Sequence, residues 1–373
     1  AAQSALIPNG QQAYITWNVT IPDDAQRVDV VFSASGGDYQ DASRPTLGSL
    51  DNQGIPVYRY QALETVAELR VAQPAEMALL RFEVQTHNAL GAALLKSGDF
   101  QRAIEAHRQA QELLAAGPPS VGNQRDLRYE QALTLEALVL TRSAAFLDQQ
   151  NRRGPRRPGQ EAPPTAPPEI QAEFQQAVQL LGSLLRDAPE NADYLLALAR
   201  CQRSALPVAW ANADQQAAAT AKQQGIGILQ RLADQQPNDL TIRFELADTL
   251  AMTAQADTRQ PLPDSDVAVL ERSLQLATDL HEKCPTAPEY AILQANVHQR
   301  LGAHFLAAKQ WSAAQDHQTK ASDELELLVA SSPTNPLFQS SLACVRWELA
   351  DSLQRQGAFA PARQLLEKAI AQY

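Results

Sequence analysis

The sequence is poor in glycine and cysteine and has no long apolar run, and each shortage excludes a class of protein. Glycine supplies 16 of 373 residues, about 4% against the usual ~7%, whereas the abundant alanine, leucine and glutamine all favour helices. The three cysteines, Cys201, Cys284 and Cys344, are an odd and sparse set that does not make a disulfide framework. No run of 18 apolar residues is present, so nothing in the sequence is built to span a bilayer.

Catalytic and metal-binding signatures are also missing. The sequence contains no HExxH, no Walker loop and no GxSxG. No two of its six histidines lie four residues apart, as a zinc pair on a helix requires. His281 and Cys284 are three residues apart, but a capping histidine and a buried thiol explain them better than a metal pair. We therefore expect no enzyme activity, no cofactor and no metal.

The net charge bears on the kind of partner. It is −11, with an isoelectric point of about 5.1, which argues against a general binder of nucleic acids or anionic membranes. The chain starts at Ala1 rather than at methionine, which favours a fragment that once followed a signal peptide or a membrane helix.

Prolines recur at a fixed interval. Pro189, Pro237, Pro285 and Pro333 are each 48 residues apart, and Pro74 and Pro118 are separated by 44 residues. Because proline lacks an N–H and cannot continue a helix, we expect each of them at the break between two helices.

The residues around the prolines repeat as well. A leucine stands five residues before each of the six prolines, and a small residue stands twelve before. The tenth residue after each of the last four prolines is an alanine: Ala199, Ala247, Ala295 and Ala343. Small residues allow helix backbones to approach closely, and leucines at helical spacing fill the seam. Each unit is then a helix hairpin that buries its apolar face only by stacking on its neighbours.

Three segments resemble the second half of a tetratricopeptide repeat. Gly98, Phe100, Ala103 and Ala110 have the same spacing as Gly357, Phe359, Ala362 and Ala369, and Trp311, Ala314 and Ala321 form a third copy. Leu90-Gly91 resembles the first-helix signature of that superfamily, and the segment 284–290 resembles long-period arrays attached to bacterial Ser/Thr kinases. The usual repeat has about 34 residues, so a 48-residue unit gives each helix about two extra turns.

We therefore expect a mostly α protein, an α-solenoid in which helix hairpins form a right-handed superhelix over residues 58–373. The pattern predicts helices at 60–72, 75–96, 100–116, 123–149, 169–187, 191–206, 212–235, 239–256, 265–283, 287–308, 311–331, 335–356 and 359–372. Residues 150–168 are a Pro/Arg-rich loop with two PxxP motifs, which we expect to be disordered or extended; docking in an aromatic groove is the alternative.

Residues 1–57 do not follow the period and are expected to be a small β-rich segment. Residues 13–21 alternate large apolar and polar side chains, residues 27–32 suggest a second strand, and residues 55–60 a short third. Two or three strands are marginal alone, so this segment either packs on the first helices or is the remnant of a larger β domain.

The resemblance implies that the first helix of each hairpin lines a concave groove. Counting from the repeated alanines, the predicted binding residues are Asn88, Arg200, Arg203, Phe244, Asp248, Asn296, Gln299 and Trp347. Their mixture of apolar and polar groups suits a helix or an extended peptide. The alternatives are that the apolar positions belong to the core and that the arginines are ordinary surface charge. Some relatives clamp a C-terminal carboxylate with asparagine and lysines; Asn88 matches, but the lysines are absent.

The expected function is a protein–protein interaction scaffold or sensor module that binds a protein or peptide in this groove. The alternative is a regulatory part of a larger bacterial signalling protein, of kinase or envelope type, whose catalytic or membrane part lies outside this chain. A bacterial cytoplasm and a periplasm both fit, as does the soluble part of an anchored or secreted protein. The partner and the oligomeric state stay open.

Overall fold

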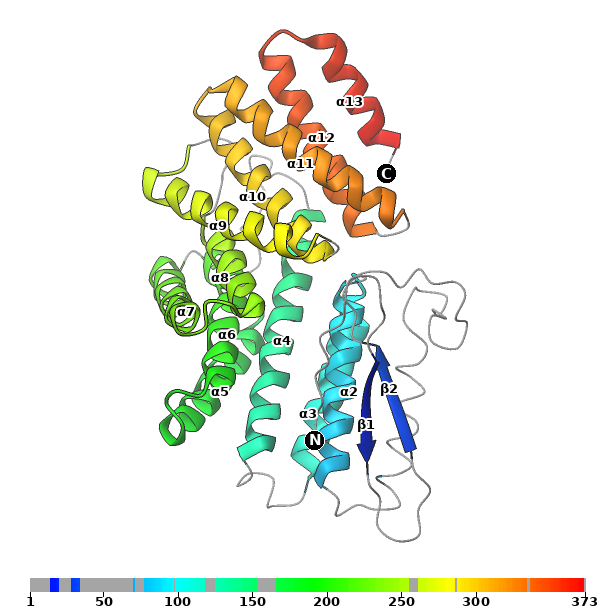
Figure 1. Ribbon diagram of the computed structural model, residues 1–373. Helices are drawn as coiled ribbons and strands as arrows, with labels where there is room; N and C mark the ends of the chain where they lie inside the picture. Colours follow the sequence, from blue (N-terminus) through cyan, green and yellow to red (C-terminus); the bar gives the residue numbers. More distant parts are fainter. Residues whose placement is uncertain are drawn as a thin grey trace.

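The computed structural model describes residues 14–19, 28–33, 70, 77–96, 98–117, 125–152, 166–212, 214–254, 261–285, 287–333 and 336–371. In these residues it contains one antiparallel pair of strands and twelve helices stacked as an α-solenoid (Figure 1). The helices are α2 (Met77–Lys96), α3 (Phe100–Ala116), α4 (Arg125–Arg152), α5 (Pro168–Asp187), α6 (Ala192–Ala211), α7 (Gln215–Gln235), α8 (Leu240–Thr253), α9 (Asp264–Lys283), α10 (Pro288–Ala307), α11 (Trp311–Ser331), α12 (Pro336–Arg355) and α13 (Phe359–Ala371).

Consecutive helices pair into six hairpins. The even-numbered helices α2 to α12 are the first of each hairpin and are called A helices here; the odd-numbered helices α3 to α13 are the B helices. Each A helix packs against its own B helix and against the B helix of the preceding hairpin. The mostly α solenoid expected from the sequence is thus confirmed.

The repeated prolines lie where the sequence places them. The residues that precede the last four prolines have nearly the same backbone angles, with φ from −129° to −144° and ψ from 67° to 77°. The N–H of each donates to the carbonyl of the leucine five residues before the proline, which satisfies one of the carbonyls that every helix end leaves free. These leucines are Leu184, Leu232, Leu280 and Leu328, and all four are buried.

Small residues form the seams between helices. The four repeated alanines are buried, and Ala247 and Ala295 belong to clusters that join successive hairpins. At Gly91 and Gly302 the approach is closest. A Cβ at Gly91 would lie 2.5 Å from the ring of His107, and one at Gly302 would lie 2.8 Å from Cγ of Gln318.

Helix α6 differs from its prediction. We expected it to end at residue 206, before Pro207, but it continues through Pro207 to Ala211. The additional turn carries Val208, which is buried in a cluster with Val139, Phe146 and Ile170 of α4 and α5. Burial of this apolar side chain offsets the helix hydrogen bond that the proline cannot make. Helix α8 differs in the other direction, because it ends at Thr253 rather than at 256.

The two strands, β1 (Tyr14–Val19) and β2 (Val28–Ser33), are antiparallel, with Trp17 opposite Val30. They coincide with the first two strands expected from the sequence. The expected third strand at 55–60, the boundary at residue 57 and most of the expected helix at 60–72 lie outside the described residues, as does most of the loop at 150–168.

Candidate functional site: the face of the A helices

One side of the stack is formed by the A helices. The A helices of consecutive hairpins contact one another at every step from α2 to α12, in addition to their contacts with the B helices. Side chains reach from one A helix to the next over 42 to 49 residues of sequence at several of these steps. The side on which successive helices meet is the inner side of a curved stack, so we call it the inner face.

At the start of the array, polar side chains join α2 to α4. Asn88 donates from Nδ2 to Oγ1 of Thr134 at 2.8 Å, and its Oδ1 lies 3.0 Å from Nδ1 of His107 on α3. Gln85 and Arg81 both donate to Oε1 of the buried Glu130, at 2.6 and 2.8 Å. The predicted binding residue Asn88 of α2 therefore already has partners in two other helices, α3 and α4.

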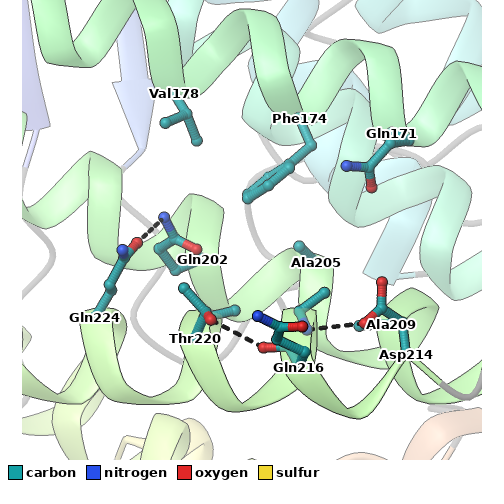
Figure 2. A pocket seen from close by; sticks show the side chains of 12 residues that line it. Gln171, Phe174, Val178, Gln202, Ala205, Ala209, Asp214, Gln216, Thr220 and Gln224 are labelled. Carbon is teal, nitrogen blue, oxygen red and sulfur yellow. Dashed lines mark hydrogen bonds between the residues drawn. The ribbon is translucent and has the colours of Figure 1, made fainter.

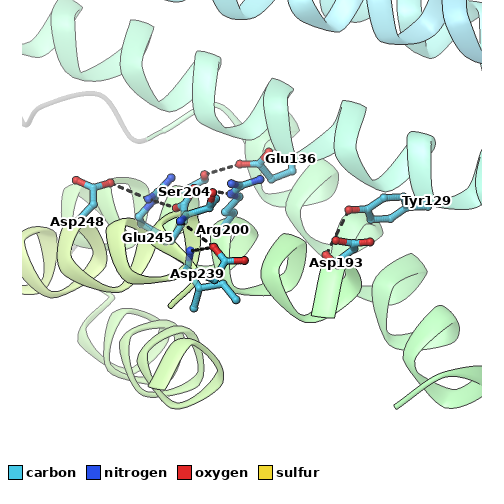
Figure 3. Close-up of polar contacts among 11 residues, drawn as sticks. Tyr129, Glu136, Asp193, Arg200, Ser204, Asp239, Glu245 and Asp248 are labelled. Carbon is cyan, nitrogen blue, oxygen red and sulfur yellow. Dashed lines mark hydrogen bonds and ion pairs between the residues drawn. The ribbon is translucent and has the colours of Figure 1, made fainter. Parts of the chain in front are cut away.

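In the middle of the array, two arginines of α6 meet two carboxylates of α8. Arg200 donates to Glu245 at 2.6 Å, and Arg203 donates to Glu245 at 2.5 Å and to Asp248 at 2.7 Å. Beside them, Ser204 of α6 donates to Glu136 of α4 at 3.1 Å (Figure 3). Three consecutive A helices are thus linked by one group of charged side chains, which we call the charge cluster.

Burial sets the electrostatics of the charge cluster. It raises the pKa of Glu136 and of Asp248 above their usual range, although the neighbouring arginines lower both. Burial alone would lower the pKa of Arg203, but Asp248 and Glu245 together raise it. The Arg203 side chain is only 12% exposed. Both arginines therefore pair with carboxylates of the array, and little of their positive charge is left for a partner.

The last two A helices present a different surface. Trp347 of α12 is 58% exposed, and Asn296 of α10 and Cys344 of α12 are also exposed. Gln299 of α10 donates to Oε1 of Glu348 at 2.9 Å, which ties α10 to α12. Burial raises the pKa of Glu348 to about 7. Although the Cys344 residue is exposed, its sulfur is partly shielded from water beside Gln299 and Glu348, and this desolvation and the Glu348 carboxylate raise its pKa to about 11, so the thiol stays protonated at neutral pH and is a poor nucleophile.

The apolar residues of α6, α8 and α10 that occupy the position of Phe244 in the 48-residue period are half-buried. Phe244 packs against the core cluster between α8 and α10, and its ring centroid lies 5.6 Å from that of Tyr290. Leu196 and Ile292 likewise pack against core clusters. Of the eight predicted residues, the structure leaves Asn296 and Trp347 exposed and engages the others in contacts within the array.

The sequence did not indicate a pocket between the B helices α5 and α7, over α6. It has a volume of about 450 Å³. Phe174 and Val178 of α5 lie on one side of it and Thr220 and Gln224 of α7 on the other, and Gln202 of α6 donates to Gln224 at 2.9 Å (Figure 2). The signal in the sequence was weak: alanines 205, 209, 217 and 221, which line it, are common throughout the chain.

Other kinds of site find no support in the part of the chain that the structure describes. No group of three or more His, Cys, Asp and Glu side chains there is arranged to hold a metal ion. None of the helices described is long and apolar enough to cross a membrane.

The fold places the chain among helical-hairpin repeat proteins. No model of a known protein family matches it, and no curated protein matches its sequence. Among solved structures it is similar to the S. pombe nuclear import adaptor Nro1, at 14% identity over 79% of this chain and 93% of that chain, with a TM-score of 0.43. It is also similar to BtubC from P. vanneervenii (12% identity, 85% of this chain, 88% of that chain, TM-score 0.31) and to yeast Tom70 (11%, 85%, 92%, 0.17). Likenesses this distant carry no argument about what the chain binds.

Proposed function

We propose that this chain is a non-catalytic interaction scaffold built from tetratricopeptide-type hairpins, and that its inner face binds a peptide or protein segment. The observation that carries the proposal is the exposed indole of Trp347 on that face. An exposed tryptophan is the kind of anchor that dominates protein interfaces, and Trp347 lies 48 residues after Gln299, at the equivalent position of its A helix.

The charge cluster limits which side chains of a partner the inner face can bind. Because Arg200 and Arg203 already pair with Glu245 and Asp248, a partner carboxylate would have to displace a bonded neighbour. We therefore expect a segment with an apolar or aromatic side chain that packs on Trp347. Asn296 would then bond to its backbone. This chemistry suits an amphipathic helix or an extended peptide.

The test compares capture of native lysate proteins by three forms of the purified chain: the unmodified protein, Trp347→Ala and Leu327→Ala. Leu327 is 69% exposed but lies on the B helix α11, so it is the matched control. We expect a partner that is retained by the unmodified protein and by Leu327→Ala and is lost with Trp347→Ala. Retention by Trp347→Ala, or equal loss with Leu327→Ala, would move binding away from the inner face.

Arg203 is unsuitable for this experiment although it is a predicted binding residue. Removing its side chain leaves Asp248 without its cation and Glu245 with Arg200 alone, so a loss of binding would be confounded with a loss of stability. Arg200 is more exposed, at 33% of its side chain, and Arg200→Gln keeps an amide donor near Glu245. We expect this variant to retain the partner, since the charge cluster is not the anchor.

A further inference from the structure

The last B helix, α13, differs from the other five in what covers it. Helices α3, α5, α7, α9 and α11 are each packed between two A helices, their own and the next. Helix α13 packs against α12, and no described helix follows it. In the other B helices, a second face packs against the next A helix. The corresponding face of α13 is not covered by any of the described helices.

The 48-residue period identifies which side chains belong to this face. Counting back from Ile370 in steps of 48 gives Ser322, Leu274, Ile226 and Val178. Leu274 packs with Leu293 and Val297 of α10. Ile226 packs in the same way against α8, and Val178 against α6. Position 370 is thus the place where the following A helix docks in the earlier hairpins.

On α13 this position is open. Ser322 is 5% exposed, whereas Ile370 is 74% exposed and Phe359 is 66% exposed. These two are half of the four large apolar side chains that are most exposed in the described residues. Residues 359 and 370 are eleven apart, about three helical turns, so they share a face, and the half-buried Leu366 lies between them on the same side. Exposed apolar side chains gathered on one helix face mark an interaction surface, so this stripe calls for an occupant.

We propose that the occupant is a second copy of this chain, which pairs through α13 in antiparallel orientation about a two-fold axis. The stripe is self-complementary in that arrangement. One large apolar side chain lies near each end of the helix. In an antiparallel pair, Phe359 of one copy therefore lies against Ile370 of the other, and this contact occurs twice. The two Leu366 side chains lie between these contacts, near the middle of the pair. An isologous two-fold contact is also the commonest way in which soluble chains associate.

The charges beside the stripe fit the same geometry. Arg363 and Glu367 form an exposed pair at 3.3 Å on α13. In the antiparallel arrangement, Arg363 of each copy approaches Glu367 of the other, so the flanking charges attract across the axis. The net charge of −11 on each copy opposes association over longer range, and added salt screens that repulsion. The pairing should therefore strengthen with salt.

Sedimentation velocity over a wide concentration range tests the proposal on the full chain. We expect a reversible monomer–dimer equilibrium for the unmodified protein and for Leu327→Asp. We expect a monomer for Ile370→Asp with the same melting temperature, because the side chain is exposed. A monomer at every concentration, or a dimer unaffected by Ile370→Asp, would overturn the proposal and leave the face to a helix from another source.

Cross-linking tests the antiparallel geometry separately. The two proteins are Phe359→Cys and Ile370→Cys, each in a Cys344→Ser background because Cys344 is exposed. We expect a mixture of the two to form a disulfide-linked dimer on mild oxidation, and either protein alone to form little. Cross-linking of Ile370→Cys with itself would contradict the antiparallel arrangement. Neither experiment depends on binding at the inner face.

Discussion

At the scale of single residues, three of the turns between A and B helices, those of the α2–α3, α10–α11 and α12–α13 hairpins, share one backbone conformation. Gly98 and Gly357 have φ of 78° and 81° at this position, and Lys309, which lies 48 residues before Gly357, has φ of 60°. Only glycine adopts this left-handed region without strain from a Cβ atom. Lys309 therefore occupies a glycine position, in the turn after α10.

We expect Lys309→Gly to raise the free energy of unfolding by roughly 0.5–1 kcal/mol. Relief of the strained backbone exceeds the added entropy of glycine in the unfolded chain. Chemical denaturation measures the change. Lys309→Ala is the control, because it removes the charge but keeps the Cβ atom. An equal gain from Lys309→Ala would assign the effect to charge instead.

A second prediction concerns Arg203 in the charge cluster. Arg203→Ala leaves Asp248 without its ion-pair partner and removes one of the two cations, Arg200 and Arg203, that pair with Glu245, whose side chain is 8% exposed. Loss of one partner of a buried ion pair costs about 3–5 kcal/mol. The control is Lys320→Ala, which removes an exposed pair with Asp316 on α11, and such pairs contribute little. If both variants unfold at the same denaturant concentration, the cluster does not stabilise the array.

At the scale of elements, histidines join the two helices of a hairpin. Nδ1 of His298 on α10 lies 2.9 Å from Nδ1 of His317 on α11, so one ring must be neutral to accept the bond. The pKa of His298 is lowered to about 4, mostly by burial and also by His317 and Lys320, while Asp316 acts in the opposite direction. Burial likewise lowers the pKa of His107 to about 4 at the α2–α3 hairpin.

These shifts predict acid sensitivity. The pKa of each ring is lower in the folded chain than its ordinary 6.5, so protons bind the unfolded chain first as the pH falls. The stabilisation is present above about pH 6.5 and is lost progressively towards pH 4. We expect His298→Gln to reduce the fall in melting temperature between neutral pH and about pH 4.5. His107→Gln, in a distant hairpin, should act independently and add to it. An unchanged fall in the double variant would assign the acid sensitivity to other groups.

Most element boundaries were predictable because they depend on local chemistry. A helix ends directly before each of the last four repeated prolines, and alternating apolar residues marked the two strands. The end of α6 was missed because it depends on the burial of Val208 by α4 and α5, which lies far away in the sequence. The leucines five residues before the last four prolines are buried, as expected of side chains that fill the seam between helices.

At the scale of the whole molecule, stability should follow the one-dimensional order of the hairpins. Each hairpin contacts only its neighbours, so a local defect is felt mainly nearby. Ala295 on α10 is fully buried among side chains of α11 and α12. We expect Ala295→Leu to overpack this seam at a cost of roughly 1–3 kcal/mol.

Hydrogen exchange measures how far such a defect extends. We expect amide protection in α10 to α12 to fall in Ala295→Leu, while protection in α2 to α4 stays as in the unmodified chain. Gln354→Ala, at an exposed position of α12, is the control and should leave the pattern unchanged. A uniform fall across all hairpins would show that the array unfolds as one cooperative unit.

The sequence alone determined the hairpin period, nearly all helix ends and the small-residue seams, because proline, leucine and alanine act within a few residues of their own position. It also predicted that Arg200, Arg203, Asp248 and Trp347 lie on one side of the A helices. Only the tertiary structure decided which of them remain free, since Arg203 meets Glu245 and Asp248 across 42 and 45 residues of sequence. The exposure of Trp347 and the open face of α13 likewise follow from how neighbouring hairpins stack, which no local pattern specifies.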